Sequence, residues 1–345
     1  MSCRNVSLFY FTNILYNTVM KNLPKLIVIL GPTSSGKTKL AVEVAHQFNG
    51  EIVSADSRQV YKGMDIGTGK DLNEYGKGSE AIQYHLIDVV ESHKQFNLKQ
   101  YQTLANKAID GIIKRKKTPI LVGGSGLYLQ AVVDGYQLSE AKPELKKVTI
   151  SKLSLEEIYT QIKKLDPKFL DRLNNSEKKN KQRLLRYLEI IQSSKTAHYD
   201  LHGTSKPQYT SLVIGIDYSL NTIRQKIKKR LDDRFEQGMI KEVKSLHQNG
   251  LIWEKLEAFG LEYKFISQYL QKKITFTEMI EKLTIASGQF AKRQMTWFRR
   301  WEKQGREILW VKGKNILNRR LSNTINSFLT EKSNVRSKNN ILTLK

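Results

Sequence analysis

Short apolar runs alternate with longer amphipathic stretches over much of the chain. The runs of strand length are KLIVIL (25–30), EIVSAD (51–56), PILVGG (119–124), SLVIGID (211–217) and EILWV (307–311). Runs that are apolar nearly throughout are typical of parallel strands buried on both faces. Helical spacing follows the first run, in TKLAVEVAHQF (38–48). The alternation predicts an α/β fold with a mostly parallel sheet flanked by helices on both faces.

The pattern changes between about residues 135 and 206, where strand-like runs vanish and the chain is helical and charged. Ser154, with Glu157 three residues later, forms the capping box that starts a helix. The apolar positions that should line one face of this helix are Leu155, Ile158, Ile162 and Leu165. We therefore expect a helical subdomain inserted into the α/β domain.

These patterns divide the chain into five parts. We expect an unstructured extension at 1–22, the first part of the α/β core at 23–134 and the helical insertion at 135–206. The chain should return to the core, with C-terminal helices, at 207–312 and end in a polar tail at 313–345. The stretch VSLFYFTNILYNTVM (6–20) could instead be a weak transit-like leader. We favour either an unstructured extension or a start codon assigned too early, with Met20 as the true start.

Charge and cysteine usage narrow the class of protein. The chain has 58 basic and 33 acidic residues, a formal net charge of +25. Such an excess favours a polyanionic partner such as nucleic acid, although a lysine-rich surface from an AT-biased genome is the alternative. Cys3 is the single cysteine, which excludes a disulfide framework and a cysteine-based zinc site. We expect a cytoplasmic protein with no membrane partner, because no apolar run has the length of a membrane helix.

The segment GPTSSGKT fits the phosphate-loop pattern G-x-x-x-x-G-K-[ST], and it lies between a strand and a helix as the pattern requires. Backbone N–H groups of the loop and the helix N-terminus form an anion cradle. Lys37 should reach terminal phosphate oxygens, and the hydroxyl of Thr38 should hold Mg²⁺. The pattern indicates a fold like that of P-loop NTPases and a diphosphate site, without identifying ATP. The residues expected to bind this diphosphate are Gly31, Pro32, Thr33, Ser34, Ser35, Gly36, Lys37 and Thr38.

Two acidic residues compete for a place beside this loop. Asp56 ends the second strand, at the edge of the sheet where open α/β folds bind ligands. Asp88 ends the apolar segment HLID (85–88). A carboxylate near a diphosphate is repelled unless Mg²⁺ or a base role accounts for it. The alternative for Asp56 is a cap on the following turn.

Four motifs occur in a fixed order: GPTSSGKT, DSRQVYKGMDIGTGK (56–70), LVGGSGLY (121–128) and AKRQMTWFRRW (291–301). Together they resemble the bacterial tRNA dimethylallyltransferases of the tRNA isopentenyltransferase family, over about residues 24–310. The resemblance implies transfer of a dimethylallyl group from dimethylallyl diphosphate to N6 of adenine-37 in the tRNA anticodon stem-loop. The tRNAs would be those that read codons beginning with U, and the products N6-(dimethylallyl)adenosine and diphosphate.

The resemblance also assigns roles to residues. It implies that Asp56 is the general base, that Lys37 and Arg230 act on the diphosphate, and that Mg²⁺ is the cofactor. Arg230 is matched by its distance from GMIKEV (238–243). The residues expected to contact tRNA are Asp56, Ser57, Arg58, Gln59, Ser125, Gln182, Arg183, Arg186, Lys292, Arg293, Gln294, Thr296, Trp297 and Arg299. Trp297 could stack on an unpaired base, but we favour a place in the core.

The sequence also departs from the family pattern. Ser125 stands where the family often has Thr, which keeps a hydroxyl. Asp71 stands where Pro usually follows GTGK, and Gly288 where an Arg is common. The segment AFGLEYKF (258–265) replaces a shorter GY form, and 174–186 is longer and more basic than usual. These differences concern the details of RNA contact more than the chemistry.

Other functions fit part of the pattern. A prenyltransferase acting on free adenine nucleotides would not need the basic insertion or the cations of 291–301. A P-loop kinase or NTPase would turn over ATP and ignore prenyl diphosphates. A non-catalytic RNA-binding protein would have no use for Lys37, Thr38 and Asp56 together. We expect a monomer that modifies tRNA.

Overall fold

The computed structural model describes residues 23–138, 153–173, 175–193, 206–313 and 316–331. The chain divides into two compact units, residues 136–206 and the remainder. The expected extension at 1–22 lies outside the described residues. Among the residues that the structure describes, none of the helices combines the length and apolar character needed to cross a membrane.

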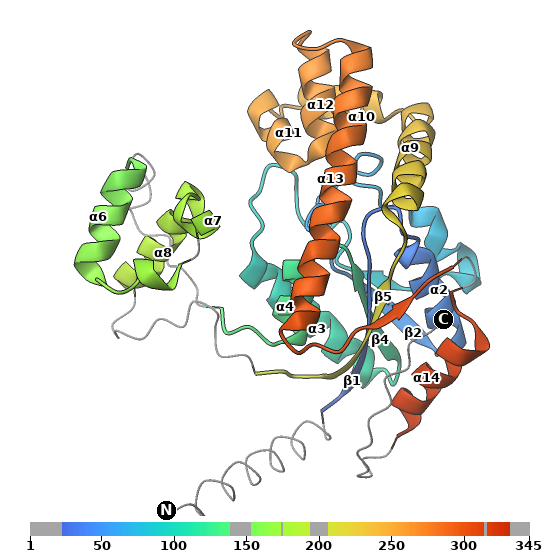
Figure 1. Ribbon diagram of the computed structural model, residues 1–345. Helices are drawn as coiled ribbons and strands as arrows, with labels where there is room; N and C mark the ends of the chain where they lie inside the picture. Colours follow the sequence, from blue (N-terminus) through green and yellow to red (C-terminus); the bar gives the residue numbers. More distant parts are fainter. Residues whose placement is uncertain (1–22, 139–152, 174, 194–205, 314–315, 332–345) are drawn as a thin grey trace, which may run out of the picture. The chain divides into compact units, whose positions relative to one another are not determined.

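The larger unit is built on one sheet whose strands are all parallel (Figure 1). The strands are β1 (Lys25–Leu30), β2 (Gly50–Ser54), β3 (Tyr84–His85), β4 (Thr118–Gly123), β5 (Thr210–Ile216) and β6 (Leu309–Val311). Their order across the sheet is β3-β2-β4-β1-β5-β6. The predicted α/β fold class is confirmed. β3 was not among the expected strands, because two residues are too few to show an apolar run.

Helices cover both faces of the sheet. One face packs against α3 (Leu98–Lys114), α4 (Gly126–Val133) and the C-terminal half of α13 (Phe276–Lys303). The other packs against α2 (Lys37–Gln47) and α14 (Arg319–Thr330). Alternate residues of β1 enter the two cores, as a strand buried on both faces requires. Two short 3-10 helices, η1 (Leu72–Tyr75) and η2 (Gly78–Glu80), lie between β2 and β3.

The helix α14 differs from the expected polar tail at 313–345. Its N-cap is Asn318, whose side chain accepts a hydrogen bond from the N–H of Leu321 at 3.0 Å. Leu321 and Ile325 are buried at i, i+4 spacing and extend the core on that face. The segment is polar on average, but its few apolar residues share one helical face, which is sufficient for packing.

A third apolar core lies beyond the sheet, among the C-terminal helices. It contains α9 (Leu220–Glu236), α10 (Met239–Gln248), α11 (Trp253–Phe259), α12 (Leu261–Leu270) and the N-terminal half of α13. Val60, Tyr61 and Met64, which follow β2, are buried in the same core. The chain after β2 is thereby fixed to helices that come almost 200 residues later in the sequence.

The smaller unit is helical, with α6 (Leu155–Leu165), η3 (Leu170–Arg172), α7 (Asn175–Lys178) and α8 (Lys181–Ser193). The predicted capping box is present: Ser154 and Glu157 exchange side-chain and backbone hydrogen bonds at 3.2 and 2.6 Å. Ile158 and Ile162 are fully buried, whereas Leu155 and Leu165, which end the expected apolar face, are exposed. The buried face of α6 is therefore shorter than the apolar face that we expected.

Candidate active site

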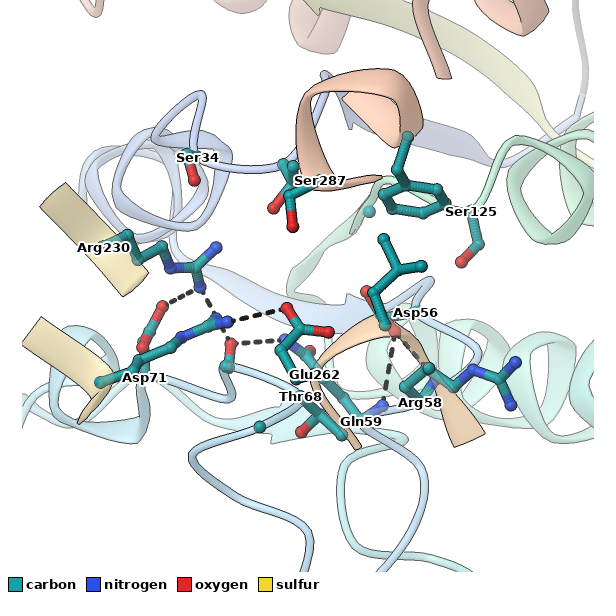
Figure 2. Close-up of a pocket in the computed structure, with 18 of the residues that line it drawn as sticks. Ser34, Asp56, Arg58, Gln59, Thr68, Asp71, Ser125, Arg230, Glu262 and Ser287 are labelled. Carbon is teal, nitrogen blue, oxygen red and sulfur yellow. Dashed lines mark hydrogen bonds and ion pairs between the residues drawn. The ribbon is translucent and has the colours of Figure 1, made fainter. Parts of the chain in front are cut away.

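A cavity of about 620 Å³ lies at the carboxyl ends of β1, β2 and β4, within the larger unit. The phosphate loop, the segment after β2 and the loop before η1 form part of its wall, and α9, the α11–α12 junction and α13 complete it. Figure 2 shows Asp56 and Ser125 on one side of this space and Arg230 with Asp71 on the other. Parallel strands bring these segments to one edge because their carboxyl ends coincide there.

The phosphate loop has the backbone that an anion cradle needs. Gly36 is the N-cap of α2 at φ 82°, a left-handed conformation that suits glycine. No side chain caps the helix, so its first N–H groups stay free of side-chain partners there. Ser35 is buried, and its hydroxyl has no partner among the described residues. Lys37 and Thr38 line the cavity with Thr33, Ser34 and Gly36.

Lys37 is held in an unusual state. Burial first, and then the nearby charge of Arg230, lower the pKa of its ammonium to about 8, against the opposing effect of Asp56, Asp71 and Glu74. The Nζ atom is 3.5 Å from the carbonyl oxygen of Pro32. A buried lysine beside an arginine is stabilised by an arriving anion, which is the ligand that this loop is built to hold.

Asp56 lies in the cavity and also caps the next turn. Its Oδ1 accepts hydrogen bonds from the N–H groups of Arg58 at 2.8 Å and Gln59 at 3.4 Å. The carboxylate still lines the cavity, so the capping alternative and a role in the site are compatible. Asp88 lies outside the set of described residues that line the cavity, and its carboxylate is paired with Lys70. The geometry therefore favours Asp56 over Asp88 as the acidic residue beside the phosphate loop.

Arg230 faces the cavity from α9. Its Nη2 donates to the carbonyl oxygen of Gly69 at 3.2 Å and forms an ion pair with Asp71, as Figure 2 shows. Arg234, one turn later, is 5% exposed and donates to Glu262 at 3.3 Å. The Nε of Arg234 has no hydrogen-bond partner among the described residues. Sequence reasoning missed Arg234, although its i, i+4 spacing from Arg230 placed it on the same helical face.

Glu242 of α10 fixes the loop that carries Gly67 and Gly69. One of its carboxylate oxygens accepts the N–H groups of Asp65 and Ile66 at 2.8 and 2.7 Å. The other accepts from the N–H of Gly67 at 3.0 Å and the hydroxyl of Tyr263 at 2.7 Å. Sequence analysis did not single out Glu242, because its partners in the loop are 175 to 177 residues away and no local pattern indicates them.

The residues predicted after β2 and β4 are brought together. The N–H of Ser57 donates to the hydroxyl of Ser125 at 3.2 Å, so the hydroxyl retained at this position has a partner. The amide of Gln59 donates to Gly69 at 2.8 Å. Asp56, Ser57, Arg58, Gln59 and Ser125 all line the cavity with the phosphate loop. Their contact with tRNA stays a prediction.

The predicted RNA-contacting residues of α13 fall into two groups. Lys292, Arg293 and Thr296 are exposed. Gln294 is buried, donating to the carbonyl oxygen of Gly124 at 2.9 Å and accepting from the N–H of Thr33 at 2.9 Å. It therefore ties the phosphate loop to the loop after β4, and its observed contacts are with protein.

Trp297 and Arg299 also have protein partners. The Trp297 ring packs on Gly126, where an added Cβ would lie 2.3 Å from a ring carbon, and its Nε1 donates to Gln130 at 3.2 Å. This placement agrees with the favoured core position. Arg299 pairs with Asp217 and Glu302, both at 3.2 Å. The Arg299 side chain stays 42% exposed, and its contact with tRNA stays a prediction.

The remaining predicted contacts belong to the smaller unit. Gln182 and Arg183 are exposed on α8, and Arg186 is half-buried there. Arg183 pairs with Glu177 and Arg186 with Glu189, each at 3.1 Å. Surface pairs of this kind contribute little to stability and exchange partners readily, so both cations are available to a polyanion.

Comparison with known proteins places this geometry in a family. The model of the IPP transferase family matches residues 59–301. A tRNA dimethylallyltransferase of Syntrophus aciditrophicus is 45% identical over 296 residues, which cover 86% of this chain and 95% of the relative. The chain belongs to the IPP transferase family. The resemblance drawn from the four motifs is confirmed, and the family makes this protein a transferase enzyme.

Solved structures agree with the membership. The tRNA isopentenylpyrophosphate transferase of Bacillus halodurans has a TM-score of 0.62 at 30% identity, with 88% of this chain and 95% of that one covered. A eukaryotic dimethylallyltransferase described as acting on tRNA has a TM-score of 0.74 at 25% identity, with 89% and 80% covered. The P-loop-like fold expected for an IPP transferase is confirmed by these likenesses.

The contacts of Glu242 lead to a prediction. Glu242→Ala should weaken binding of inorganic pyrophosphate by about tenfold or more, because three loop N–H groups lose their acceptor at ~1 kcal/mol or more each. Glu242→Gln, which keeps one acceptor oxygen, should be intermediate. Titration calorimetry measures the affinities, with the exposed Glu254→Ala as matched control. Unchanged affinity in Glu242→Ala would show that the loop holds its shape without this carboxylate.

Proposed function

We propose that this IPP transferase moves a dimethylallyl group from dimethylallyl diphosphate to N6 of adenine-37 in tRNAs that read codons beginning with U. The observation that carries the proposal is that the phosphate loop and the Asp56 carboxylate line one cavity. A leaving diphosphate and a nucleophilic amine can therefore be bound in the same cavity. The 45% identical relative, named as a tRNA dimethylallyltransferase, supports the same reaction.

The donor end of the cavity suits a leaving diphosphate. When the allylic C–O bond breaks, negative charge grows on the departing oxygens. Lys37, Arg230 and Arg234 line the cavity and supply cations fixed in place before the reaction. Contacts with protein groups hold Arg230 and Arg234 in the cavity wall before the charge develops.

The acceptor end suits an exocyclic amine. In the proposed step the adenine N6 forms a bond to the allylic carbon, the C–O bond breaks, and one N6 proton passes to the Asp56 carboxylate. A positioned carboxylate helps such a weak nucleophile by accepting its proton. The adenine must leave its stack to enter the cavity, which costs a few kcal/mol.

The oxygen donors of the cavity fit Mg²⁺. The hydroxyl of Thr38 and the carboxylates of Asp56, Asp71 and Glu74 all line it, and oxygen is the donor that Mg²⁺ prefers. Among the described residues there is no cluster of three or more histidine, cysteine or acidic side chains that could hold a metal. Thr38 would therefore hold the ion together with the diphosphate. The bound ion would neutralise charge on the diphosphate oxygens.

The basic surface favours tRNA over a free nucleotide as acceptor. Lys292 and Arg293 are exposed on α13, one turn or less from Gln294 in the cavity wall. A nucleotide that fills the cavity would not need them, whereas an RNA backbone would. We further propose that Gln182, Arg183 and Arg186 of the smaller unit bind the same RNA, and that the enzyme acts as a cytoplasmic monomer.

The decisive experiment supplies Mg²⁺, labelled dimethylallyl diphosphate and unmodified tRNA, followed by digestion and nucleoside analysis. The expected product is N6-(dimethylallyl)adenosine next to the anticodon. Prenylation of free adenine nucleotides but not tRNA would support the first alternative. ATP hydrolysis without prenyl transfer would support a kinase or NTPase and contradict the proposal.

Replacing Asp56 separates its two roles. Asp56→Asn keeps an oxygen that can cap the N–H groups of Arg58 and Gln59 but removes the base. We expect kcat to fall by about 10²–10⁴-fold with little change in tRNA affinity. Single-turnover transfer and filter binding measure the two quantities. A loss of tRNA affinity with kcat preserved would contradict the base role.

The lowered pKa of Lys37 predicts a pH dependence. Its ammonium is charged below a pKa of about 8 and loses the charge as pH rises through that value. The kcat/KM for the donor, which reports on free enzyme, should therefore fall above pH 8. Lys37→Arg, which stays charged, should be slower but flat from pH 8 to 9. A fall at the same pH in Lys37→Arg would assign it to another group.

A further inference from the structure

Asp71 places a negative charge inside the wall that the donor diphosphate must approach. It follows Lys70, which is 1% exposed and anchored to the carbonyl oxygen of Tyr61 at 2.8 Å and to Asp65 at 2.5 Å. Asp71 itself adopts a left-handed backbone with φ 46°. The fixed neighbour and the unusual backbone direct its carboxylate to Arg230, with which it is paired.

The ion pair engages a cation that the diphosphate needs. The side chains of Arg230 and Asp71 are 27% and 35% exposed, so the pair is partly shielded from water. Both residues line the cavity with Lys37. Glu74 also lines the cavity; partial desolvation raises its pKa, and the charge of Asp71 raises it further.

We propose that Asp71 is an internal counter-ion that weakens diphosphate binding by occupying Arg230. The arriving diphosphate must take over the guanidinium from the Asp71 carboxylate and lie close to that carboxylate while bound. Asp71 thereby limits donor affinity and increases the dependence of binding on Mg²⁺, which offsets the repulsion. The identity of the ligand as a prenyl diphosphate rests on the proposed function, but the electrostatic effect applies to any diphosphate.

A positioning role for Asp71 would have the opposite effect on diphosphate binding. If Asp71 only positioned Arg230, its removal would let the guanidinium move away and would weaken diphosphate binding. Arg230 has a second contact that survives such a change, the hydrogen bond to the carbonyl oxygen of Gly69 at 3.2 Å. Arg234, one turn along, packs against the same glycine, where an added Cβ would lie 1.5 Å from its Nη2. Arg230 therefore keeps a hydrogen bond to the cavity wall without Asp71.

The test is Asp71→Asn, because asparagine tolerates the left-handed backbone and removes only the charge. Titration calorimetry with inorganic pyrophosphate should show about tenfold tighter binding than wild type, with a larger gain when Mg²⁺ is withheld. Asp166→Asn is the matched control, since Asp166 also pairs with an arginine, Arg172, but in the smaller unit. Its affinity should equal that of wild type. Equal or weaker binding by Asp71→Asn overturns the proposal.

A second variant ties the effect to Arg230. In an Arg230→Gln background, Asp71→Asn should give a clearly smaller gain, because the cation that Asp71 occupies is gone. An undiminished gain would mean that Asp71 acts without Arg230, and would overturn the counter-ion role. The tRNA assay separates the two proposals: tighter pyrophosphate binding without prenyl transfer leaves this inference standing and removes the proposed function. Prenyl transfer without the affinity change does the reverse.

Discussion

The shape of the cavity depends on one buried side-chain amide, that of Gln294. Gln294 accepts a hydrogen bond from Thr33 and donates one to Gly124, so it joins the loops that follow β1 and β4. Loops at the ends of parallel strands have no ladder of their own to fix them, and their backbone groups need partners from elsewhere. Gly124 must be glycine for this contact, since an added Cβ would lie 2.4 Å from the amide nitrogen. The phosphate loop is thereby held by a helix 261 residues later in the chain.

This long-range support explains which features could be predicted from sequence. The apolar runs, the phosphate loop and the Ser154 capping box are local patterns, and each is found in the structure. Glu242 and the supporting role of Gln294 depend on contacts between distant segments, which no local pattern records. Arg234 was missed although it lies one helical turn from Arg230. β3 has two residues and α14 is polar on average, so neither gave a clear signal. The site was predicted where a motif carries it and missed where tertiary contacts complete it.

The charges of the cavity are closely balanced, and that balance governs its chemistry. Lys37, Arg230 and Arg234 line one cavity together with Asp56, Asp71 and Glu74. Two of the cations have pKa values lowered first by burial and then by the charge of Arg230. Without the carboxylates this group of cations would repel itself; without the cations the carboxylates would exclude a diphosphate. A diphosphate that binds there therefore interacts with all of these charged side chains. The cost of separating the existing ion pairs limits its affinity.

The helix α13 connects the charged cavity to the protein surface. Arg293 is exposed while its neighbour Gln294 is buried, and Phe298 and Trp301 continue the buried face. The same 28-residue helix therefore fixes the phosphate loop from one side and presents cations to solvent on the other. Trp297 lies between these faces, packed on Gly126 and covered by the Arg300 guanidinium at 4.5 Å. Because such a packed helix moves as a unit, RNA held on its outer face would be positioned relative to the diphosphate by Gln294, without a flexible element between them.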